Sequence, residues 1–480
     1  MRWCKGLLRL MKSHLAQNKL KQLFGPKDFK LTRFIFFSAI VFLFGLISRI
    51  NPAIAPLLIL LSVYLGFRKL NIKSYTLLNT SLLFLIIFVV GYYIIKKGYP
   101  VFFIPFSAVP ILTTLLFQNL ELSLIITLSA AISVASVSNY ALPLLLLFLI
   151  SGILSSVLLV GARKRITIIR AGLIAGIAQV ITLILIDRFW LGEPHRYTVL
   201  LFNGLASSII VLGILPIFEY LFKTVTNISL LELSDFNHPL LRRMIMEAPG
   251  TYHHSLVVGN LSESACQAVG ANSLLARIGA YYHDIGKLHK PEYFSENQPV
   301  KESKHDTLAP TMSKLIIMNH VREGIELAKK YKLTPPLVDF ITQHHGDSLV
   351  YYFYRRALES IEEDHEVKEE GFRYPGPKPA TKETAIVLLA DSVEAATRAL
   401  KDPSPAKIED VVHKVINNKF IDGQLDECDL ALKELEKISA VFIRILSGIY
   451  HGRATYPDES GERLSENNHK KSPKEDPYQH

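Results

Sequence analysis

The feature that most constrains the fold of this chain is a series of long, almost uncharged runs in its first half. They lie at residues 34–48, 50–67, 75–95, 98–120, 122–162, 171–186 and 197–218. A helix that spans a bilayer needs roughly 20 mostly apolar residues, because the hydrocarbon core is about 30 Å thick. Most of the runs reach this length once their flanks are included. The first half is therefore predicted to be a bundle of membrane helices.

One of these runs, 122–162, is too long for a single helix. The segment 138–140 (Ser-Asn-Tyr), followed by Pro143, is a natural turn inside it, so the run is predicted to contain two helices. The sequence then predicts about eight spans for residues 33–224. The alternative concerns the first two runs, which could form one re-entrant pair instead of two spans.

The charges at the ends of the runs predict how the bundle is oriented. Residues 1–33 contain nine Lys or Arg residues and one acidic residue, so this tail carries a net +8 of the total +10. Basic flanks lie on the cytoplasmic side of spanning helices. The cluster Arg163-Lys164-Arg165 agrees with this orientation, whereas Lys96-Lys97 disagrees. A nucleic acid polymer is the alternative partner for the tail, but a membrane surface explains its charge without a further partner.

The second half has the composition of a soluble helical domain. Apolar residues recur at spacings of three and four, without the sustained alternation of a strand. Residues 381–400, for example, are predicted to be one helix with Ile386, Leu389 and Val393 on its inner face. The predicted architecture is thus all-α. Its predicted parts are a basic cytoplasmic tail (1–32), a membrane domain (33–224), a helical domain (225–456) and a disordered polar tail (457–480).

The three cysteines narrow the kinds of metal site that the chain can form. Cys4, Cys266 and Cys428 are scattered and lack CxxC spacing. This pattern argues against a disulfide framework or a cysteine zinc site, and it suits a reducing compartment.

Histidines and acidic residues at long, irregular intervals in the second half form a candidate metal site. The His-Asp doublet within residues 280–287 is the most informative of them. Divalent transition metals need imidazole and carboxylate donors from different elements, and two metals about 3.5–4 Å apart share a carboxylate or a water. Asp284 is the obvious bridge, because its neighbour His283 can hold one metal. In chain order the candidate ligands are His254, His283, Asp284, His320, His344, His345 and Asp391.

These motifs resemble those of the bacterial membrane 7TMR-HD family, within the HD-domain phosphohydrolase superfamily. The resemblance covers essentially all of residues 225–456. It is carried by the segments 230–235, 248–255, 281–287, 296–298, 343–346, 372–378 and 390–395. It implies an all-helical HD domain in the cytoplasm, attached to a multi-pass domain in the bacterial cytoplasmic (inner) membrane.

The resemblance also implies an enzyme, a metal-dependent phosphodiesterase that hydrolyses cyclic di-AMP to linear pApA. Of its two divalent metal ions, iron or manganese, one would be held by His254, His283, Asp284 and Asp391, and the other by Asp284, His320, His344 and His345. Asp284 and Lys287 are the implied catalytic residues, since Lys287 resembles a phosphate-contacting lysine in the pattern HD-x-x-K. The implied partners are a cyclic dinucleotide, the lipid bilayer and further copies of the chain in a homo-oligomer.

The sequence departs from the family at one place and leaves two other functions open. Full-length members carry a large extracytoplasmic domain after the first span. In this sequence only about residues 50–52 separate the first two apolar runs, and the extracytoplasmic domain is therefore expected to be absent. The metal ligands determine which reaction is catalysed, but they do not determine which nucleobase the substrate carries. Cyclic di-GMP or a mononucleotide is therefore an alternative substrate. A second alternative is a non-catalytic membrane receptor that only binds a nucleotide, although the complete ligand set weighs against it.

Overall fold

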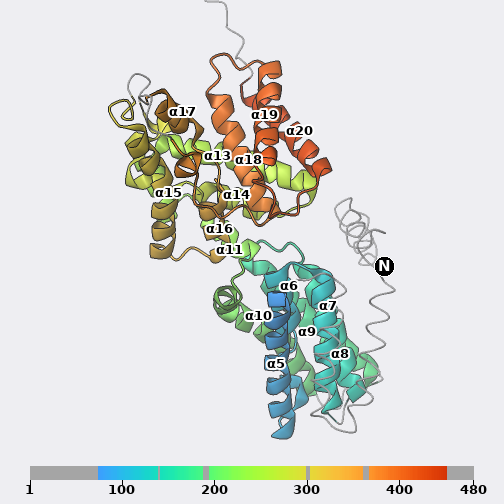
Figure 1. Cartoon of the computed structure of the whole chain (residues 1–480). Coiled ribbons are helices and arrows are strands. Elements are labelled where there is room, and N and C mark those ends of the chain that lie inside the picture. Colours follow the sequence, from blue (N-terminus) through green and yellow to red (C-terminus); the bar gives the residue numbers. More distant parts are fainter. Residues whose placement is uncertain (1–73, 139–140, 188–193, 299–302, 361–366, 451–480) are drawn as a thin grey trace, which may run out of the picture.

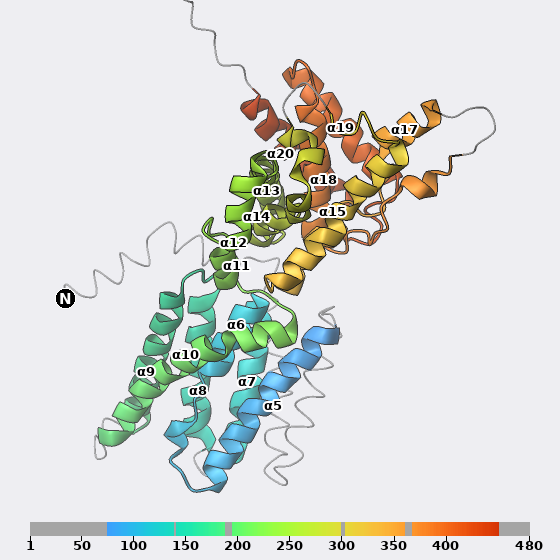
Figure 2. The ribbon, with the colours of Figure 1, turned by 90° about the vertical axis from the view of Figure 1, so that its left-hand side faces the viewer.

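The computed structural model describes residues 74–138, 141–187, 194–298, 303–360 and 367–450. Every regular element in this part of the chain is a helix, apart from an isolated antiparallel bridge between Leu349 and Arg373. The predicted all-α architecture is therefore confirmed. Figures 1 and 2 show two helical bundles in sequence order, with the short helix α11 (Asn227–Leu233) between them.

The first bundle is formed by the apolar half of the chain. Its helices are α5 (Ser74–Lys96), η1 (Val101–Phe103, a 3-10 helix), α6 (Ala108–Phe117), α7 (Leu120–Ser136), α8 (Ala141–Leu159), α9 (Arg165–Ile186) and α10 (Pro194–Phe222). Among the described residues, α8, α9 and α10 are long and apolar enough to cross a membrane. Leu142, Ile181 and Phe202 on these helices each expose more than half of their surface, as expected of side chains that contact lipid. The predicted runs 34–48 and 50–67 lie outside the described residues.

The predicted run 98–120 does not form one continuous helix. It begins with η1, and its α-helical part α6 has ten residues, which is about 15 Å at 1.5 Å per residue. Pro105 interrupts the run because proline has no backbone N–H to donate. Asn203 of α10 compensates by donating from Nδ2 to two carbonyl oxygens of this segment, at 2.8 and 3.0 Å. The run 122–162, by contrast, forms two helices, as predicted.

Helices α9 and α10 cross at a contact made of glycine residues. A Cβ atom added to Gly204 would lie 2.2 Å from the carbonyl oxygen of Gly172 and 2.5 Å from the amide nitrogen of Gly176. Gly172 and Gly176 are four residues apart and therefore lie on the same face of α9. Small residues at such a crossing let two membrane helices approach closely, and this packing drives their association in lipid.

The second bundle contains the remaining helices. Its α-helices are α12 (Pro239–Glu247), α13 (Pro249–Val269), α14 (Ser273–Tyr282), α15 (Pro310–Lys330), α16 (Pro335–Gln343), α17 (Tyr351–Glu359), α18 (Lys382–Arg398), α19 (Pro405–Ile421) and α20 (Leu432–Ile449). Four 3-10 helices complete it: η2 (Ile285–His289), η3 (Pro291–Tyr293), η4 (Ser295–Asn297) and η5 (Glu369–Phe372).

Helix α18 lies at the centre of this bundle and packs against α13, α14, α16, α19 and α20. The prediction of one helix over residues 381–400 is confirmed, with Thr381 as its capping residue. Ile386, Leu389 and Val393 are fully buried, as their spacing predicts. A helix buried on nearly all sides is a rigid platform, which matters because Asp391 projects from it.

Helix α11 connects the two bundles by inserting one residue into each core. Ile228 packs in a core of the membrane bundle, and Leu230 packs in a core of the second bundle. At its start, the Glu219 carboxylate of α10 accepts hydrogen bonds from the Thr226 amide (2.7 Å) and the Ser229 hydroxyl (2.8 Å). At its end, the Tyr282 hydroxyl donates to a carbonyl oxygen of α11 at 2.7 Å. Tyr282 directly precedes the His-Asp doublet, so α11 is anchored at both ends.

The glycine crossing yields a test of the membrane bundle. We expect Gly204→Leu to push α9 and α10 apart, because the new side chain would occupy space now filled by the backbone of α9. Overpacking typically costs about 1–3 kcal/mol, so the thermal midpoint of the full chain in detergent should fall by several degrees. Gly213→Leu is the matched control, since a Cβ there meets no atom within 4 Å. Equal midpoints for the two variants would contradict this packing.

Candidate metal centre

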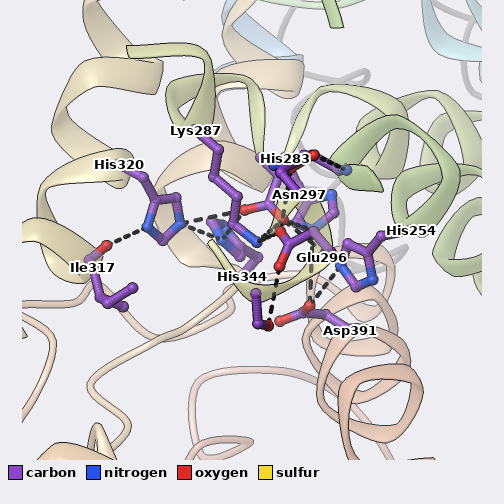
Figure 3. Close-up of polar contacts among 12 residues, drawn as sticks. His254, His283, Lys287, Glu296, Asn297, Ile317, His320, His344 and Asp391 are labelled. Atoms are coloured by element: carbon purple, nitrogen blue, oxygen red, sulfur yellow. Dashed lines mark hydrogen bonds and ion pairs between the residues drawn. The ribbon is translucent and has the colours of Figure 1, made fainter. Parts of the chain in front are cut away.

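Seven polar residues from five helical regions converge in the second bundle, and they are the seven predicted from the sequence. Figure 3 labels His254, His283, His320, His344 and Asp391 among them. The seven are His254 of α13, His283 and Asp284 after α14, His320 of α15, His344 and His345 after α16, and Asp391 of α18. They form two groups that share Asp284, and the donor atoms within each group lie within 4.8 Å of one another. Such a donor set of imidazoles and carboxylates fits divalent transition metals.

The Asp284 carboxylate directs one oxygen atom to each group. Its Oδ2 lies 3.2 Å from Nε2 of His283 and 3.6 Å from Nε2 of His254. Its Oδ1 lies 3.4 Å from Nε2 of His320 and 3.6 Å from Nε2 of His344. A carboxylate that uses its two oxygens in this way can bridge two cations.

Asp391 is the second carboxylate that contacts histidines of both groups. Its Oδ1 lies 3.0 Å from Nε2 of His254 and 3.8 Å from Nε2 of His283. Its Oδ2 lies 3.6 Å from Nδ1 of His345. Asp391 therefore contacts histidines of both groups, although its Oδ1 faces the group of His254 and His283.

Hydrogen bonds behind the histidines fix which ring nitrogen faces the site. The Nδ1 atoms of His283, His320 and His344 donate to backbone carbonyl oxygens at 2.6, 2.5 and 3.0 Å. The Nδ1 atom of His254 lies 2.5 Å from the Glu394 carboxylate. Each Nε2 atom consequently faces the site, as in histidines that bind metals.

Two features of the site are unfavourable without a cation. The Nε2 atoms of His320 and His344 lie 3.1 Å apart, although both rings use Nδ1 as the donor elsewhere. Nε2 of His283 and Oδ1 of Asp284 are buried and have no hydrogen-bond partner among the described residues. Buried polar atoms are nearly always paired. Divalent cations at this site would satisfy all four atoms, so the residues fit the metal centre that their chemistry predicts.

Two glycines allow the ligands to meet. A Cβ atom on Gly286 would lie 1.7 Å from the carbonyl oxygen of His320, so only glycine lets η2 pack this closely against α15. Gly346 adopts φ +55 directly after His345, and this turn ends the helical path that would point adjacent histidines apart. The side-chain amide of Gln424 stabilises this turn through Asp347. Its Oε1 accepts from the Asp347 backbone N–H at 3.1 Å, and its Nε2 donates to the Asp347 carboxylate at 2.5 Å.

Lys287 forms a buried triad with two carboxylates. Its Nζ lies 2.7 Å from Oδ2 of Asp284 and 2.7 Å from Oε1 of Glu296. Burial lowers the pKa of Lys287, but these two charges outweigh burial and raise its pKa above the ordinary range. Burial raises the pKa of Glu296, yet Lys287 brings it down to about 2. The ammonium group thus stays charged beside the carboxylate that both groups share.

Three charged residues surround the candidate ligands, and their roles were not predicted from the sequence. Glu394 binds His254, and Glu296 binds Lys287. Arg398 lies near both carboxylates, 3.7 Å from Glu394 and 3.9 Å from Glu296. Glu394 could have been found, because it follows Asp391 by three residues on one helix and therefore shares its face.

The site is most exposed at Lys287, Asp391 and His345. The side chains of His283 and Asp284 are 0% and 1% exposed, whereas those of Lys287, Asp391 and His345 are 13%, 11% and 23% exposed. The His345 ring stacks on Tyr374 with 4.3 Å between centroids. A ligand therefore reaches the donors past Lys287 and His345.

Two family models match the chain. One is described as a 7TM receptor with an intracellular HD hydrolase and matches residues 48–226. The other is described as an HD domain and matches residues 251–396, which contain all seven converging residues. Together they cover more than half of the chain, which is a membrane protein with an HD domain.

Curated proteins of two bacteria are similar to the chain. It is 41% identical over 409 residues to the cyclic-di-AMP phosphodiesterase PgpH of Bacillus subtilis, covering 82% of this chain and 56% of that protein. It is 38% identical over 394 residues to the protein of the same name from Listeria monocytogenes, covering 81% and 54%. The chain thus spans about half the length of these relatives.

A solved structure is similar to the second bundle. A crystal structure of the HD domain of the Listeria monocytogenes phosphodiesterase PgpH is 47% identical, covers 45% of this chain and 100% of that chain, and has a TM-score of 0.43. The two family models match a membrane domain and, after it, an HD domain in this chain. The chain therefore belongs to the 7TM receptor family with an intracellular HD hydrolase domain, the 7TMR-HD family.

Proposed function

We propose that this protein is a membrane-anchored phosphodiesterase that hydrolyses cyclic di-AMP to linear pApA. The observation that carries the proposal is the Asp284 carboxylate, which directs one oxygen to each of two histidine groups. Such a shared carboxylate is typical of two-metal hydrolytic sites. Cyclic di-AMP is proposed because both curated relatives are named as phosphodiesterases of this dinucleotide.

The proposed ligands divide between two divalent ions, iron or manganese. One ion is assigned to His254, His283, Asp284 and Asp391, and the other to Asp284, His320, His344 and His345. The assignment is supported by the inward-facing Nε2 atoms and by the buried atoms that have no other partner. When bound, the ions supply Lewis-acid activation of the phosphodiester and of the attacking water.

The residues around the ligands have proposed roles in the reaction. A water oxygen adds to one phosphorus, the P–O3′ bond breaks, and O3′ leaves as a hydroxyl group that takes a proton originating from the water. Negative charge builds on the phosphoryl oxygens during this step, and a fixed ammonium nearby stabilises it. Lys287 is suited to that role because it is held charged by Asp284 and Glu296 and remains partly exposed. Glu394 holds the His254 ring in its orientation.

We infer that the HD domain, residues 225–456, lies on the cytoplasmic side of the bacterial inner membrane. The support comes from the basic segment between α8 and α9. Arg165 of this segment forms an ion pair with Glu232 of α11 at 2.6 Å. Basic loops lie in the cytoplasm, so a basic loop that contacts the linker to the HD domain favours the same side for both. The membrane domain, residues 33–224, is the proposed anchor.

The proposed activity is tested by offering the metal-loaded protein two dinucleotides. The full chain, purified in detergent without oxygen and loaded with iron or manganese, would receive equal cyclic di-AMP and cyclic di-GMP. We expect preferential formation of pApA, measured by chromatography of the linear products. No cleavage of either, with two metals verified per chain, would contradict the proposal. Tight binding without cleavage would favour a receptor, and cleavage of a different nucleotide would favour another substrate.

Asp284→Ala tests the bridging assignment. The variant removes the carboxylate shared by both groups, so both ions should bind more weakly and hydrolysis should fall more than about 100-fold. Residues behind the ligands alone typically account for 10- to 100-fold. Circular dichroism should still report a helical domain, because the bundle core does not involve this side chain. Asp410→Ala, at an exposed position on α19, is the control. Full turnover and two bound metals in Asp284→Ala would refute the bridge.

Metal binding should weaken as the pH falls. Burial lowers the pKa of His283, but Asp284 and Asp391 outweigh burial and raise it to about 10. In the metal-free protein this imidazole therefore holds a proton at pH 7, and the proton must leave before Nε2 can bind a metal. We expect affinity for manganese to rise about tenfold per pH unit for each proton released between pH 6 and 8. Calorimetry in buffers with different ionisation heats counts the protons. An affinity independent of pH would contradict the expectation.

A further inference from the structure

A pocket of about 270 Å³ lies between the η2–η3 segment and α15, directly beside the metal centre. His320 forms part of its wall and is also one of the converging residues. Phe294 is a second wall residue. Its ring meets the His320 ring edge to face at 5.9 Å, and the Lys287 ammonium lies 5.0 Å from its centroid. His320 therefore belongs both to the wall of the pocket and to the candidate metal centre.

The pocket has an apolar part that is open to solvent. Met312 and Leu315 line it from adjacent turns of α15, and they are 52% and 55% exposed. Ile316 and Phe294 complete this apolar surface. Apolar and aromatic walls with a few polar groups are typical of sites for flat organic ligands. A base of a bound dinucleotide is such a ligand, and one sugar joins it to the phosphate.

The other end of the pocket carries an oriented amide group. Nδ2 of Asn319 donates to Oε1 of Glu323 at 3.0 Å. Only the nitrogen of an amide can donate to a carboxylate, so this hydrogen bond fixes which end of Asn319 is which. The amide then offers one acceptor, Oδ1, and one further N–H.

This pairing of one donor and one acceptor distinguishes the two purines at the edge of the base that carries N7. An asparagine amide can accept from N6–H of adenine while donating to N7. Guanine presents acceptors at both O6 and N7, so Oδ1 would face another acceptor. An amide held in this orientation therefore favours adenine over guanine when the bound base presents its N7 edge to Asn319.

We propose that this pocket binds one base of the substrate and that Asn319, oriented by Glu323, selects adenine over guanine. The inference rests on the proposed function, because it requires a cyclic dinucleotide at the metal centre. It adds to that function the residues that recognise the base.

Asn319→Leu removes the amide and keeps a side chain of similar size. The KM for cyclic di-AMP should rise about 5- to 150-fold, which corresponds to the 1–3 kcal/mol of a bidentate amide–adenine pair. The value for kcat should change less, because the side chain does not touch the reacting phosphate. The ratio of kcat/KM for cyclic di-AMP over cyclic di-GMP should fall. Metal content, measured by elemental analysis, should stay at the wild-type value.

Glu323→Gln tests the orientation without removing any hydrogen-bonding atom from Asn319. A glutamine can donate as well as accept, so the Asn319 amide can turn over. We expect the preference for cyclic di-AMP to fall because the pocket accepts cyclic di-GMP better. The side chains of Asn319 and Glu323 are both partly exposed. The Glu323→Gln variant should therefore fold even if Asn319→Leu does not.

Leu315→Glu tests the apolar wall with a matched control. It should raise the KM for both dinucleotides, because a carboxylate replaces an exposed apolar wall residue. Met246→Glu makes a comparable change at a 76% exposed position on α12, outside the pocket, and should leave both KM values unchanged. Equal effects of these two variants would overturn the pocket as a binding site.

The outcomes separate this inference from the proposed function. A wild-type protein that cleaves cyclic di-AMP, with an unchanged dinucleotide preference in Asn319→Leu and Glu323→Gln, would overturn the selection of adenine alone. A wild-type protein that holds two metals and hydrolyses bis(p-nitrophenyl) phosphate but neither dinucleotide would overturn the proposed function and the pocket assignment together.

Discussion

The organisation of the candidate metal centre depends on one buried carboxylate. Asp284 is 1% exposed, and a charge at such a depth is tolerated only when positive charge surrounds it. Lys287 supplies one such charge at 2.7 Å, and four histidine nitrogens lie within 3.6 Å. The surrounding helices differ in direction and length, yet each delivers a donor to this point. The bundle is therefore arranged around a charge that apolar packing alone could not stabilise.

The position of that carboxylate relative to the first bundle is also defined by contacts. The chain of contacts runs from Glu219 at the end of α10, through α11, to Tyr282 immediately before the doublet. Ile228 and Leu230 bury α11 in the cores of both bundles, so α11 cannot tilt without disturbing one of them. A displacement of the inner end of α10 would have to break either the bond at Thr226 or the one at Tyr282. The HD domain is thus attached by defined contacts and not by a loose tether.

The sequence predicted those features that follow from composition, periodicity or ligand chemistry. The buried face of α18 and the converging ligands belong to this class, since imidazoles and carboxylates have few other reasons to gather. The break in the run 98–120 was not predicted, because apolar composition does not report that Asn203 can bond an irregular segment a hundred residues away. The role of Gln424 could not be predicted from the sequence either, because only the folded chain brings its amide to the turn after His345.

The two groups around Asp284 are chemically unequal, and this follows from what lies behind each histidine. Behind His254 is the Glu394 carboxylate, which makes the imidazole a stronger donor, whereas backbone carbonyls lie behind His320 and His344. The second group also contains His345, whose side chain is 23% exposed. Under the proposed assignment, an ion at the first group would have one strengthened donor, His254, since His283 also has a backbone carbonyl behind it. An ion held by the second group would lie near the partly exposed His345 and near His320 of the pocket wall.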